Sequence, residues 1–348
     1  MGSPQRRRLG GANELGTAVT RILGSGVAYP RHQLSAAASQ AALAQLWPAL
    51  RAVSLEPVSR RLVLPIAEVL RPRDLGEDMR LYHREATSLG RRAARRALRA
   101  AGVSAGEVDS LIAVSGTGYL VPGLDVLLAK ELGLSPMVAR VTMGEQGCSG
   151  GGAALALAHR LCTGEQSKVA LVVCVELCSV AFRADDLSGD NLTAALVFAD
   201  GAAASVLTDR DGGLQIVKAG SRLVPGTEWA LGFTLQADGF HPVLDRRLPA
   251  LIERALPAAL EEFGCGPGTF QAVHAGGPRI FDAVERALHL PQGALRASRE
   301  VFRHHGNLSS ASLLAVLAAL DPAPGEGLAL AFGPGLSIEM AHLRRLPG

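Results

Sequence analysis

The sequence is poor in aromatic residues, in charge of one sign and in long apolar runs, and each shortage excludes a class of protein. Aromatic residues make up only 4% of the 348 residues, so a stacking surface for nucleic-acid bases is not expected. The net charge of +3 is too small to favour a nucleic-acid partner. No apolar run approaches the length of about 18 residues that a membrane helix needs, and the chain does not open with a secretory signal pattern. We therefore expect neither nucleic-acid binding nor membrane insertion.

Cysteine is also scarce and is not arranged as a disulfide framework. The five cysteines are an odd number spread over more than a hundred residues, which favours a reducing compartment and predicts a cytoplasmic protein. Cys174 and Cys178 are close in sequence, but no second His or Cys pair has zinc spacing, so no metal is expected. Two of them stand in and just after a run of small apolar residues and are predicted to be buried. The cysteines are Cys148, Cys162, Cys174, Cys178 and Cys265.

Hydrophobic residues, by contrast, make up 48% of the chain, enough for a large core or for two fused halves. An internal repeat indicates two halves. Ala113–Ser115 resembles Ala272–His274, and Gly147-Cys148 resembles Gly306-Asn307, both at an offset of 159 residues (272 − 113 and 306 − 147). A third similarity, between the apolar stretches at 169–171 and 328–330, has the same offset. Three similarities in one register indicate a duplicated unit.

The sequence of each copy predicts a strand, a helix, a short strand, a second helix and a final strand. The strands are short apolar runs without polar alternation, as in sheets covered on both faces. The second helix of each copy is apolar on all sides and must be buried. This pattern predicts an α/β protein in which two buried helices lie between two sheets, with a tail at 1–20 and halves at 21–212 and 213–348. The predicted segments are 109–115, 123–132, 138–143, 149–162 and 168–176 in one copy, and 271–275, 278–289, 297–302, 308–320 and 327–332 in the other.

Cys148 and Asn307 occupy equivalent positions, each just before a buried helix. A helix N-terminus presents free N–H groups and the positive end of a dipole, which predicts a lowered pKa for the Cys148 thiol and a nucleophilic role. A buried Asn is unusual unless its amide is used. His274 ends a predicted strand on a third repeat-related loop, at the kind of strand end where α/β proteins gather catalytic groups. The repeat therefore indicates that Cys148, His274 and Asn307 are candidate catalytic residues.

Four motifs give a specific resemblance. The motifs are GlnGlyCysSerGlyGly from Gln146, HisAlaGlyGlyProArgIlePhe from His274, GlyAsnLeuSerSerAla from Gly306 and PheGlyProGlyLeuSerIleGlu from Phe332. Together and in this order they resemble the type III polyketide synthases, the chalcone synthase-like branch of the thiolase superfamily. The resemblance runs from about residue 75 to the end and more faintly from Gly24.

This resemblance implies a five-layered αβαβα thiolase-like fold, a homodimer and a Cys148-His274-Asn307 triad. It implies that a starter acyl group passes from acyl-CoA to Cys148, where His274 as imidazolium stabilises the thiolate. Decarboxylative condensation with malonyl-CoA then extends the acyl group, and the poly-β-keto chain cyclises. No cofactor or metal is implied beyond the CoA substrates.

The resemblance also implies a set of residues that bind substrate. Phe198 matches the family's gatekeeper phenylalanine, and Val121 matches the loop that reaches the partner's cavity, although members usually have Met there. Arg60 and Arg61 are expected to bind CoA. The tract at 238–249 resembles bacterial members, one subgroup of which typically carries Cys where Gly116 stands, so no product is predicted. Several of the positions where the family varies its pocket are small here, which predicts a roomy cavity; these positions are Gly116, Ala181, Pro242 and Ser309.

Three alternatives stay open at this stage. A β-ketoacyl-ACP synthase III shares the fold and triad, but would more typically show HisGlnAlaAsn where this chain has HisAlaGlyGlyPro. A biosynthetic thiolase needs a second cysteine near its C-terminus, and no cysteine follows Cys265. A silent partner subunit would lack the nucleophile, and Cys148 is present.

Overall fold

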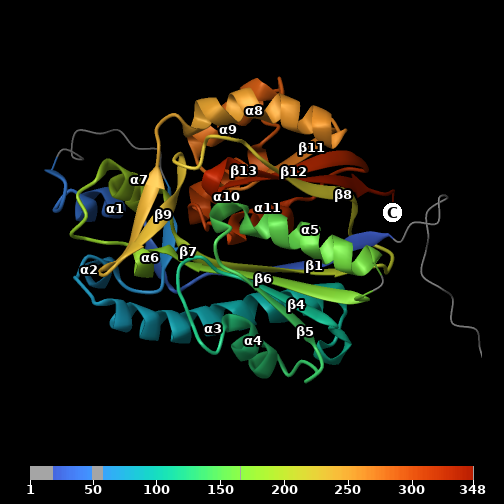
Figure 1. Cartoon of the computed structure of the whole chain (residues 1–348), viewed down its shortest axis with the longest axis horizontal. Helices are drawn as coiled ribbons and strands as arrows, with labels where there is room; N and C mark the ends of the chain where they lie inside the picture. Colours follow the sequence, from blue (N-terminus) through green and yellow to red (C-terminus); the bar gives the residue numbers. More distant parts are fainter. Residues whose placement is uncertain (1–18, 49–57, 165, 348) are drawn as a thin grey trace, which may run out of the picture.

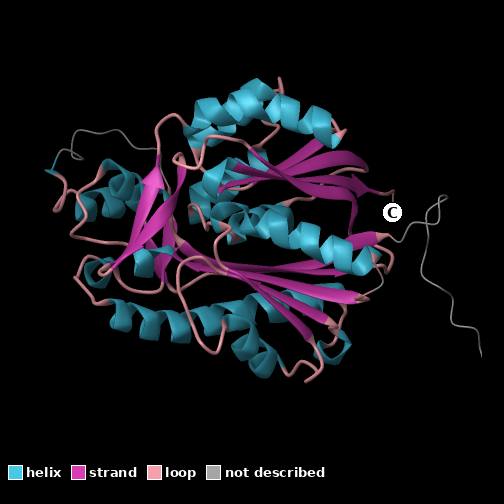
Figure 2. Cartoon of the chain, in the orientation of Figure 1, coloured by secondary structure: helices cyan, strands magenta, loops and turns pink. Residues whose placement is uncertain are grey.

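The computed structural model describes residues 19–48, 58–164 and 166–347. Figure 1 shows five layers, alternately helical and sheet-like, and Figure 2 shows the same arrangement by secondary structure. Helices α8 and α9 cover one side, α3 and α4 cover the other, and α5 and α11 lie between the two layers of strands. The predicted αβαβα fold is therefore confirmed. The helices of these layers are α3 (Leu75–Ala101), α4 (Leu124–Leu132), α5 (Gly150–Thr163), α8 (Leu248–Phe263), α9 (Pro278–Ala287) and α11 (Ala311–Ala319).

The two layers of strands show the predicted duplication. Strands β4 and β6 are parallel, as are their counterparts β11 and β12, and each half continues with antiparallel strands. A short antiparallel pairing of β1 with β8 joins the layers, so the order is β11-β12-β13-β8-β1-β7-β6-β4-β5. The strands are β1 (Thr20–Ala28), β4 (Ser110–Val114), β5 (Ala139–Met143), β6 (Val169–Leu177), β7 (Asp200–Thr208), β8 (Leu214–Leu223), β11 (Phe270–Val273), β12 (Gly325–Gly333) and β13 (Ser337–Arg345).

The duplication fails at one element. Residues 297–302 were expected to form a short strand equivalent to β5, but they lie in helix α10 (Arg296–His305). The buried residues of α10 are Ser298, Val301 and Phe302, spaced by three and four, while the charged residues between them face outward. This is the pattern of an amphipathic helix, and the adjacent pair Val301-Phe302 is not the core of a strand.

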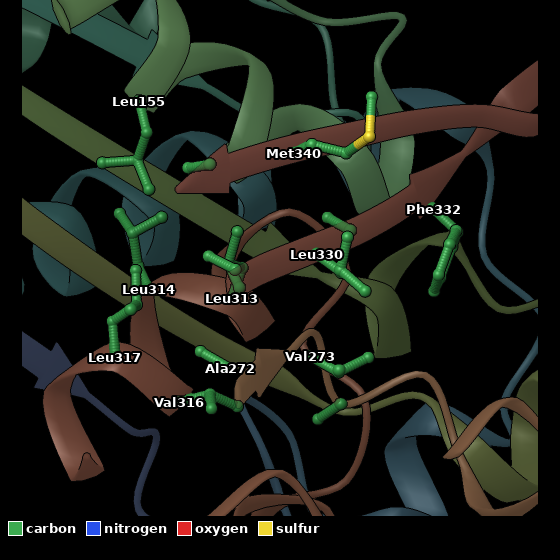
Figure 3. Packing of buried hydrophobic residues seen from close by; sticks show 14 of the residues in the cluster. Leu155, Ala272, Val273, Leu313, Leu314, Val316, Leu317, Leu330, Phe332 and Met340 are labelled. Carbon is green, nitrogen blue, oxygen red and sulfur yellow. The ribbon is translucent and has the colours of Figure 1, made fainter. Parts of the chain in front are cut away.

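The two central helices pack directly against each other because their first turns have almost no side-chain bulk. A Cβ added at Gly151 of α5 would lie 2.4 Å from the carbonyl oxygen of Ser310, which precedes α11. Figure 3 shows Leu155 of α5 facing the side of α11 that carries Leu314, while Leu313 lies near Leu330 of β12. This close approach brings the N-terminal ends of α5 and α11 together, which is where Cys148 and Asn307 lie.

The smaller elements gather at one end of the layers, on the left in Figure 1. They include a separate two-stranded hairpin, β9–β10, and they wall the cavities described below. No helix among the described residues is long and apolar enough to span a bilayer. Residues 1–18 of the predicted tail lie outside the described residues, and Thr20 already belongs to β1. The smaller elements are α1 (Ala36–Leu43), α2 (Ile66–Val69), α6 (Cys178–Ala181), α7 (Gly189–Val197), β2 (His32–Leu34), β3 (Arg60–Leu62), β9 (Leu231–Gln236) and β10 (Gly239–Leu244).

Candidate active site

Cys148 lies in a single 3-10 turn, Gly147–Ser149, that leads from the loop after β5 into α5. Gly147 has φ +49°, and a Cβ there would lie within 3 Å of the Pro334 ring. Only glycine therefore fits this turn without strain. The Cys148 side chain is buried, with its Sγ 3.7 Å from the Ser309 hydroxyl. The turn that carries Cys148 thus packs directly against the motif that contains Pro334.

The Asn307 amide is held in one orientation with its nitrogen toward Cys148. Its Oδ1 accepts hydrogen bonds from the backbone N–H of Ser309 at 2.8 Å and from the Ser312 hydroxyl at 3.0 Å. Its Nδ2 lies 4.0 Å from Cys148 Sγ. Because the oxygen is already occupied, the amide faces the thiol as a donor. Ser309 has φ +48°, so this amide is fixed by a strained backbone, as is common at functional sites.

His274 follows β11 and lines the same cavity as Cys148 and Asn307. Its backbone N–H donates to the Leu330 carbonyl at 2.9 Å, and its ring packs edge-on against Phe332 at 5.6 Å between centroids. The ring is buried, and its Nδ1 has no hydrogen-bond partner within the described part of the chain. Burial lowers the pKa of His274 to about 4, which keeps the imidazole neutral.

Burial also reverses the shift predicted for Cys148. It raises the pKa of this thiol to about 11, and the nearby Glu176 carboxyl adds to that effect, while hydrogen bonds with Ser309 and Asn307 oppose it. Burial of both groups therefore acts against the lowered Cys148 pKa and the resting thiolate–imidazolium pair that were expected. A neutral thiol and a neutral imidazole on the same cavity fit a proton transfer that accompanies nucleophilic attack.

Gly276 offers a way to displace His274 without changing the ring itself. A Cβ at this position would lie 2.7 Å from His274 Nε2. We expect Gly276→Ala to lower the rate of product formation by about tenfold or more, since small displacements of a catalytic group have effects of this order. Steady-state kinetics would measure it, with Gly266→Ala as the matched control because nothing lies within 4 Å of its added Cβ. Equal rates for the two variants would show that the position of His274 is not limiting.

Two cavities border Phe198 and Cys148. The larger, of about 920 Å³, contains Cys148, His274 and Asn307. The smaller, of about 150 Å³, contains Cys148 and four residues predicted from the family pattern, Gly116, Ala181, Pro242 and Ser309. Phe198, the predicted gatekeeper, lines both cavities.

The smaller cavity is not as roomy as the small side chains at these positions predicted. Phe182, Phe233 and Phe240 also line it, and the rings of Phe233 and Phe240 meet edge to face at 5.1 Å. A Cβ at Gly116 would lie 3.0 Å from the carbonyl oxygen of Gly144, so this chain has little space for a larger residue there. The aromatic side chains therefore take up room that the small residues leave.

Arg60 lines both cavities, but its guanidinium is already engaged by groups of the protein. Its side chain is 4% exposed and donates to the Phe198 carbonyl oxygen at 3.0 Å, as well as to the Ala195 carbonyl oxygen and the Ser39 hydroxyl. Burial lowers its pKa to about 10, with Asp200 opposing the shift. The predicted role of Arg60 in binding CoA is therefore not supported, and we assign it to holding the backbone of Phe198.

Two other predicted residues, unlike Arg60, line neither cavity. Arg61 is half-buried, and its guanidinium lies 3.4 Å from Gln33 Oε1, so it gives no support to the predicted CoA contact. Val121 is 80% exposed on the loop between β4 and α4. That position leaves it available to a second subunit.

Sequence reasoning missed a buried carboxyl group behind the cavity. Glu176 in β6 is fully buried and accepts hydrogen bonds from the Gly116 N–H, the Thr117 hydroxyl and the Ser310 hydroxyl. Burial raises its pKa to about 7, and these hydrogen bonds limit the shift. Its signal was a lone acidic residue inside an apolar strand. Cys178, predicted to be a buried apolar residue, instead lines the smaller cavity.

His241 contacts two carboxylates and so links the β9–β10 hairpin, which lines the smaller cavity, to the loop before α7. His241 Nδ1 lies 3.1 Å from Asp186 Oδ2, and its Nε2 lies 3.0 Å from Asp238 Oδ1. The hydrogen bond with Asp238 raises the pKa of His241, and Asp186 adds to it. Arg183, which forms an ion pair with Asp185, is the nearby cation. Protonated His241 can donate to both carboxylates, whereas the neutral ring can donate to only one.

The stability that these His241 contacts provide should therefore depend on pH. A raised folded-state pKa means that the contribution is complete below the ordinary value of about 6.5 and is lost as pH rises through the folded value. Amide exchange in β9–β10, corrected for its intrinsic pH dependence, should accelerate over that range. His241→Gln should remove this dependence, while His342→Gln, which alters a similar contact with Glu326, should retain it. An unchanged pH profile in His241→Gln would contradict this account.

The chain matches known proteins over nearly all of the described fold. Residues 71–210 match the N-terminal domain of the chalcone and stilbene synthases, and residues 215–347 match their C-terminal domain. A relative from Streptomyces coelicolor named 1,3,6,8-tetrahydroxynaphthalene synthase is 36% identical over 309 residues, which cover 85% of this chain and 83% of the relative. A relative of the same name from Streptomyces peucetius is 37% identical over 304 residues, which cover 82% of this chain and 80% of that one.

Solved structures give the same result. The crystal structure of 1,3,6,8-tetrahydroxynaphthalene synthase from Streptomyces coelicolor, described as a bacterial type III polyketide synthase, has a TM-score of 0.86 and 32% identity, covering 95% of this chain and all of that one. Nothing in these similarities favours the ketosynthase III alternative. The chain belongs to the chalcone and stilbene synthase family and is a type III polyketide synthase.

Proposed function

We propose that the protein loads an acyl group from acyl-CoA onto Cys148, extends it with malonyl-CoA and cyclises the poly-β-keto product. The observation that carries this proposal is the fixed amide of Asn307, whose Nδ2 lies 4.0 Å from Cys148 Sγ while its oxygen is occupied by Ser309 and Ser312. A donor aimed at the nucleophile, with the His274 imidazole in the same cavity, suits a thioester whose carbonyl oxygen becomes negatively charged.

In the loading step, the Cys148 thiol attacks the thioester carbonyl of the starter. The neutral imidazole of His274 accepts the thiol proton as the sulfur–carbon bond forms. The tetrahedral intermediate then collapses, the carbon–sulfur bond to CoA breaks, and the CoA thiolate takes the proton from the imidazolium. The low pKa of His274 in the unliganded protein favours this return of the proton.

In the extension step, malonyl-CoA loses CO₂ and leaves an enolate. The oxygen of the enolate accepts hydrogen bonds from Asn307 Nδ2 and from the N–H of the His274 ring, which stabilise the developing charge. The enolate carbon attacks the acyl thioester on Cys148, forms the new carbon–carbon bond and releases the Cys148 thiolate. That thiolate then takes the lengthened chain from CoA for another round. The sequence of steps uses CoA thioesters and no further cofactor.

Two arginines that line the larger cavity are available to bind the phosphate groups of CoA. Arg246 and Arg279 are exposed, line this cavity and form no ion pair within the described residues. The acidic residues beside them are already engaged: Asp245 binds Arg247, and Asp282 binds Arg299. The larger cavity therefore has two cations that can bind a polyanionic substrate.

We expect Arg246→Ala and Arg279→Ala each to raise the KM for malonyl-CoA by about fivefold, since an exposed charge contact is worth up to about 1 kcal/mol. The increase should shrink as salt is added, and kcat should change little. Arg254→Ala is the matched control, because this exposed arginine of α8 lies on neither cavity. A fall in kcat with unchanged KM would place both arginines outside substrate binding.

The proposed assembly is a homodimer that works in the cytoplasm. Large apolar side chains are exposed on the loop and helix after β4 and beside the edge strand β5, which is consistent with a protein–protein interface. Five unpaired cysteines fit a reducing compartment. A molecular mass of one chain at micromolar concentration would contradict the dimer. The exposed residues are Tyr119, Val121, Val126 and Met137.

The function is tested by incubating purified protein with malonyl-CoA and a set of acyl-CoA starters. Product masses should exceed each starter by whole extension units, with one CO₂ released for each unit. Release of free CoA without any condensed product would contradict the proposal.

A further inference from the structure

Part of the smaller cavity is lined by apolar residues that have no role in the reaction steps described above. Beyond Cys148 it is lined by Leu43 of α1, Leu62 of β3, Val69 of α2 and the adjoining Leu70, with Phe182 after α6. These side chains belong to two small apolar clusters that are separate from the main cores of the protein. Apolar residues thus line a space that begins at the nucleophile and leads away from the catalytic amide and imidazole.

Three polar side chains that line this cavity, those of Thr117, Ser179 and Asn191, direct their hydrogen-bond donors into the protein. The Thr117 hydroxyl donates to Glu176 at 2.9 Å, and the Ser179 hydroxyl donates to Asp200. The Asn191 amide nitrogen donates to two backbone carbonyl groups, at 2.6 and 2.7 Å. A hydroxylated or charged acyl group placed here would lose water without gaining these donors, which is unfavourable.

The geometry points to an aliphatic acyl chain of about six carbons as the starter held on Cys148, with its hydrocarbon end against Leu62, Val69 and Phe182. This inference rests on the proposed function. The length follows from the volume of about 150 Å³, because an apolar cavity of about that size holds a molecule of six carbons. The thioester lies at Cys148, and the chain points away from Asn307, which leaves the larger cavity for malonyl-CoA.

A chain-length series tests this inference directly. With malonyl-CoA held constant, kcat/KM should rise about threefold for each added methylene from acetyl-CoA to hexanoyl-CoA, as expected when each CH₂ enters an apolar site. It should then fall for decanoyl-CoA, and a hydroxylated aromatic acyl-CoA should react at least tenfold less efficiently than hexanoyl-CoA. A flat series, or a preference for the hydroxylated starter, would overturn the inference.

Variants at Val69 change the length of the space in both directions. Val69→Phe should lower the ratio of hexanoyl to acetyl efficiency by about tenfold or more, and Val69→Ala should move the optimum to longer chains. If Val69→Phe does not fold, Val69→Ala still decides the question. Leu223→Phe, at a 68% exposed position of β8, is the matched control and should keep the wild-type ratio. An unchanged optimum in Val69→Ala would place the acyl chain elsewhere.

Acetyl-CoA release from malonyl-CoA separates the two possible failures. If the protein decarboxylates malonyl-CoA and condenses starters without regard to chain length, the inference fails and the proposed function stands. If it neither decarboxylates nor condenses with any starter, both fail.

Discussion

Replacement of Cys148 by alanine is expected to abolish condensed products while leaving decarboxylation of malonyl-CoA measurable. The growing chain has no other point of attachment, whereas the enolate is stabilised by Asn307 and His274, which this change does not remove. The loss of condensation should exceed about 10³-fold, in the range seen when a covalent nucleophile is removed. Product masses report condensation, and acetyl-CoA release reports decarboxylation.

Cys265→Ala is the matched control for this variant. Cys265 is half-buried and lies on neither cavity, so its removal should leave both reactions intact. Condensed products from Cys148→Ala would mean that another group carries the chain. Loss of decarboxylation together with condensation would mean that the thiol takes part in forming the enolate.

Replacement of Asn307 by alanine is expected to slow decarboxylation by about 10²–10³-fold, the usual effect of losing one oxyanion donor. Loading of a starter onto Cys148 should continue, because that step does not depend on this amide. Intact-protein mass would show the acyl adduct, and acetyl-CoA release would show the loss.

Ser312→Ala gives a graded comparison. It keeps the amide of Asn307 but removes one of the two hydrogen bonds that orient it, together with a bond to the backbone N–H of Leu308. We expect a smaller fall in decarboxylation, of about tenfold, in line with the net value of one hydrogen bond. Decarboxylation at the wild-type rate in Asn307→Ala would rule out its role as an enolate donor.

The repeat made much of the fold and the site predictable from sequence. Cys148 and Asn307 are 159 residues apart, and one offset placed both before equivalent buried helices. A duplicated unit with its helices packed around a pseudo-twofold axis must bring equivalent positions together. In the structure Asn307 Nδ2 lies 4.0 Å from Cys148 Sγ. Where the repeat is broken the prediction failed, since the counterpart of β5 is helix α10, whose amphipathic spacing the repeat obscured.

Properties that depend on burial were harder to predict. The helix end suggested a lowered pKa for Cys148, but desolvation by burial raises it. Arg60 has the residue type of a phosphate ligand, yet its chain position carries no sign that Phe198 and Ser39 enclose it. Likewise, the small residues around Gly116 indicated space that distant Phe233 and Phe240 fill. Each of these effects comes from side chains remote in sequence.

The most direct test of this account is peptide mapping after the protein is exposed to hexanoyl-CoA without malonyl-CoA. Five cysteines are present, and the account predicts one hexanoyl adduct, on the peptide that contains Cys148. The adduct should disappear when malonyl-CoA is added and condensation proceeds. An adduct on Cys178 or on another cysteine, or an adduct that persists through turnover, would contradict the central claim that Cys148 carries the growing chain.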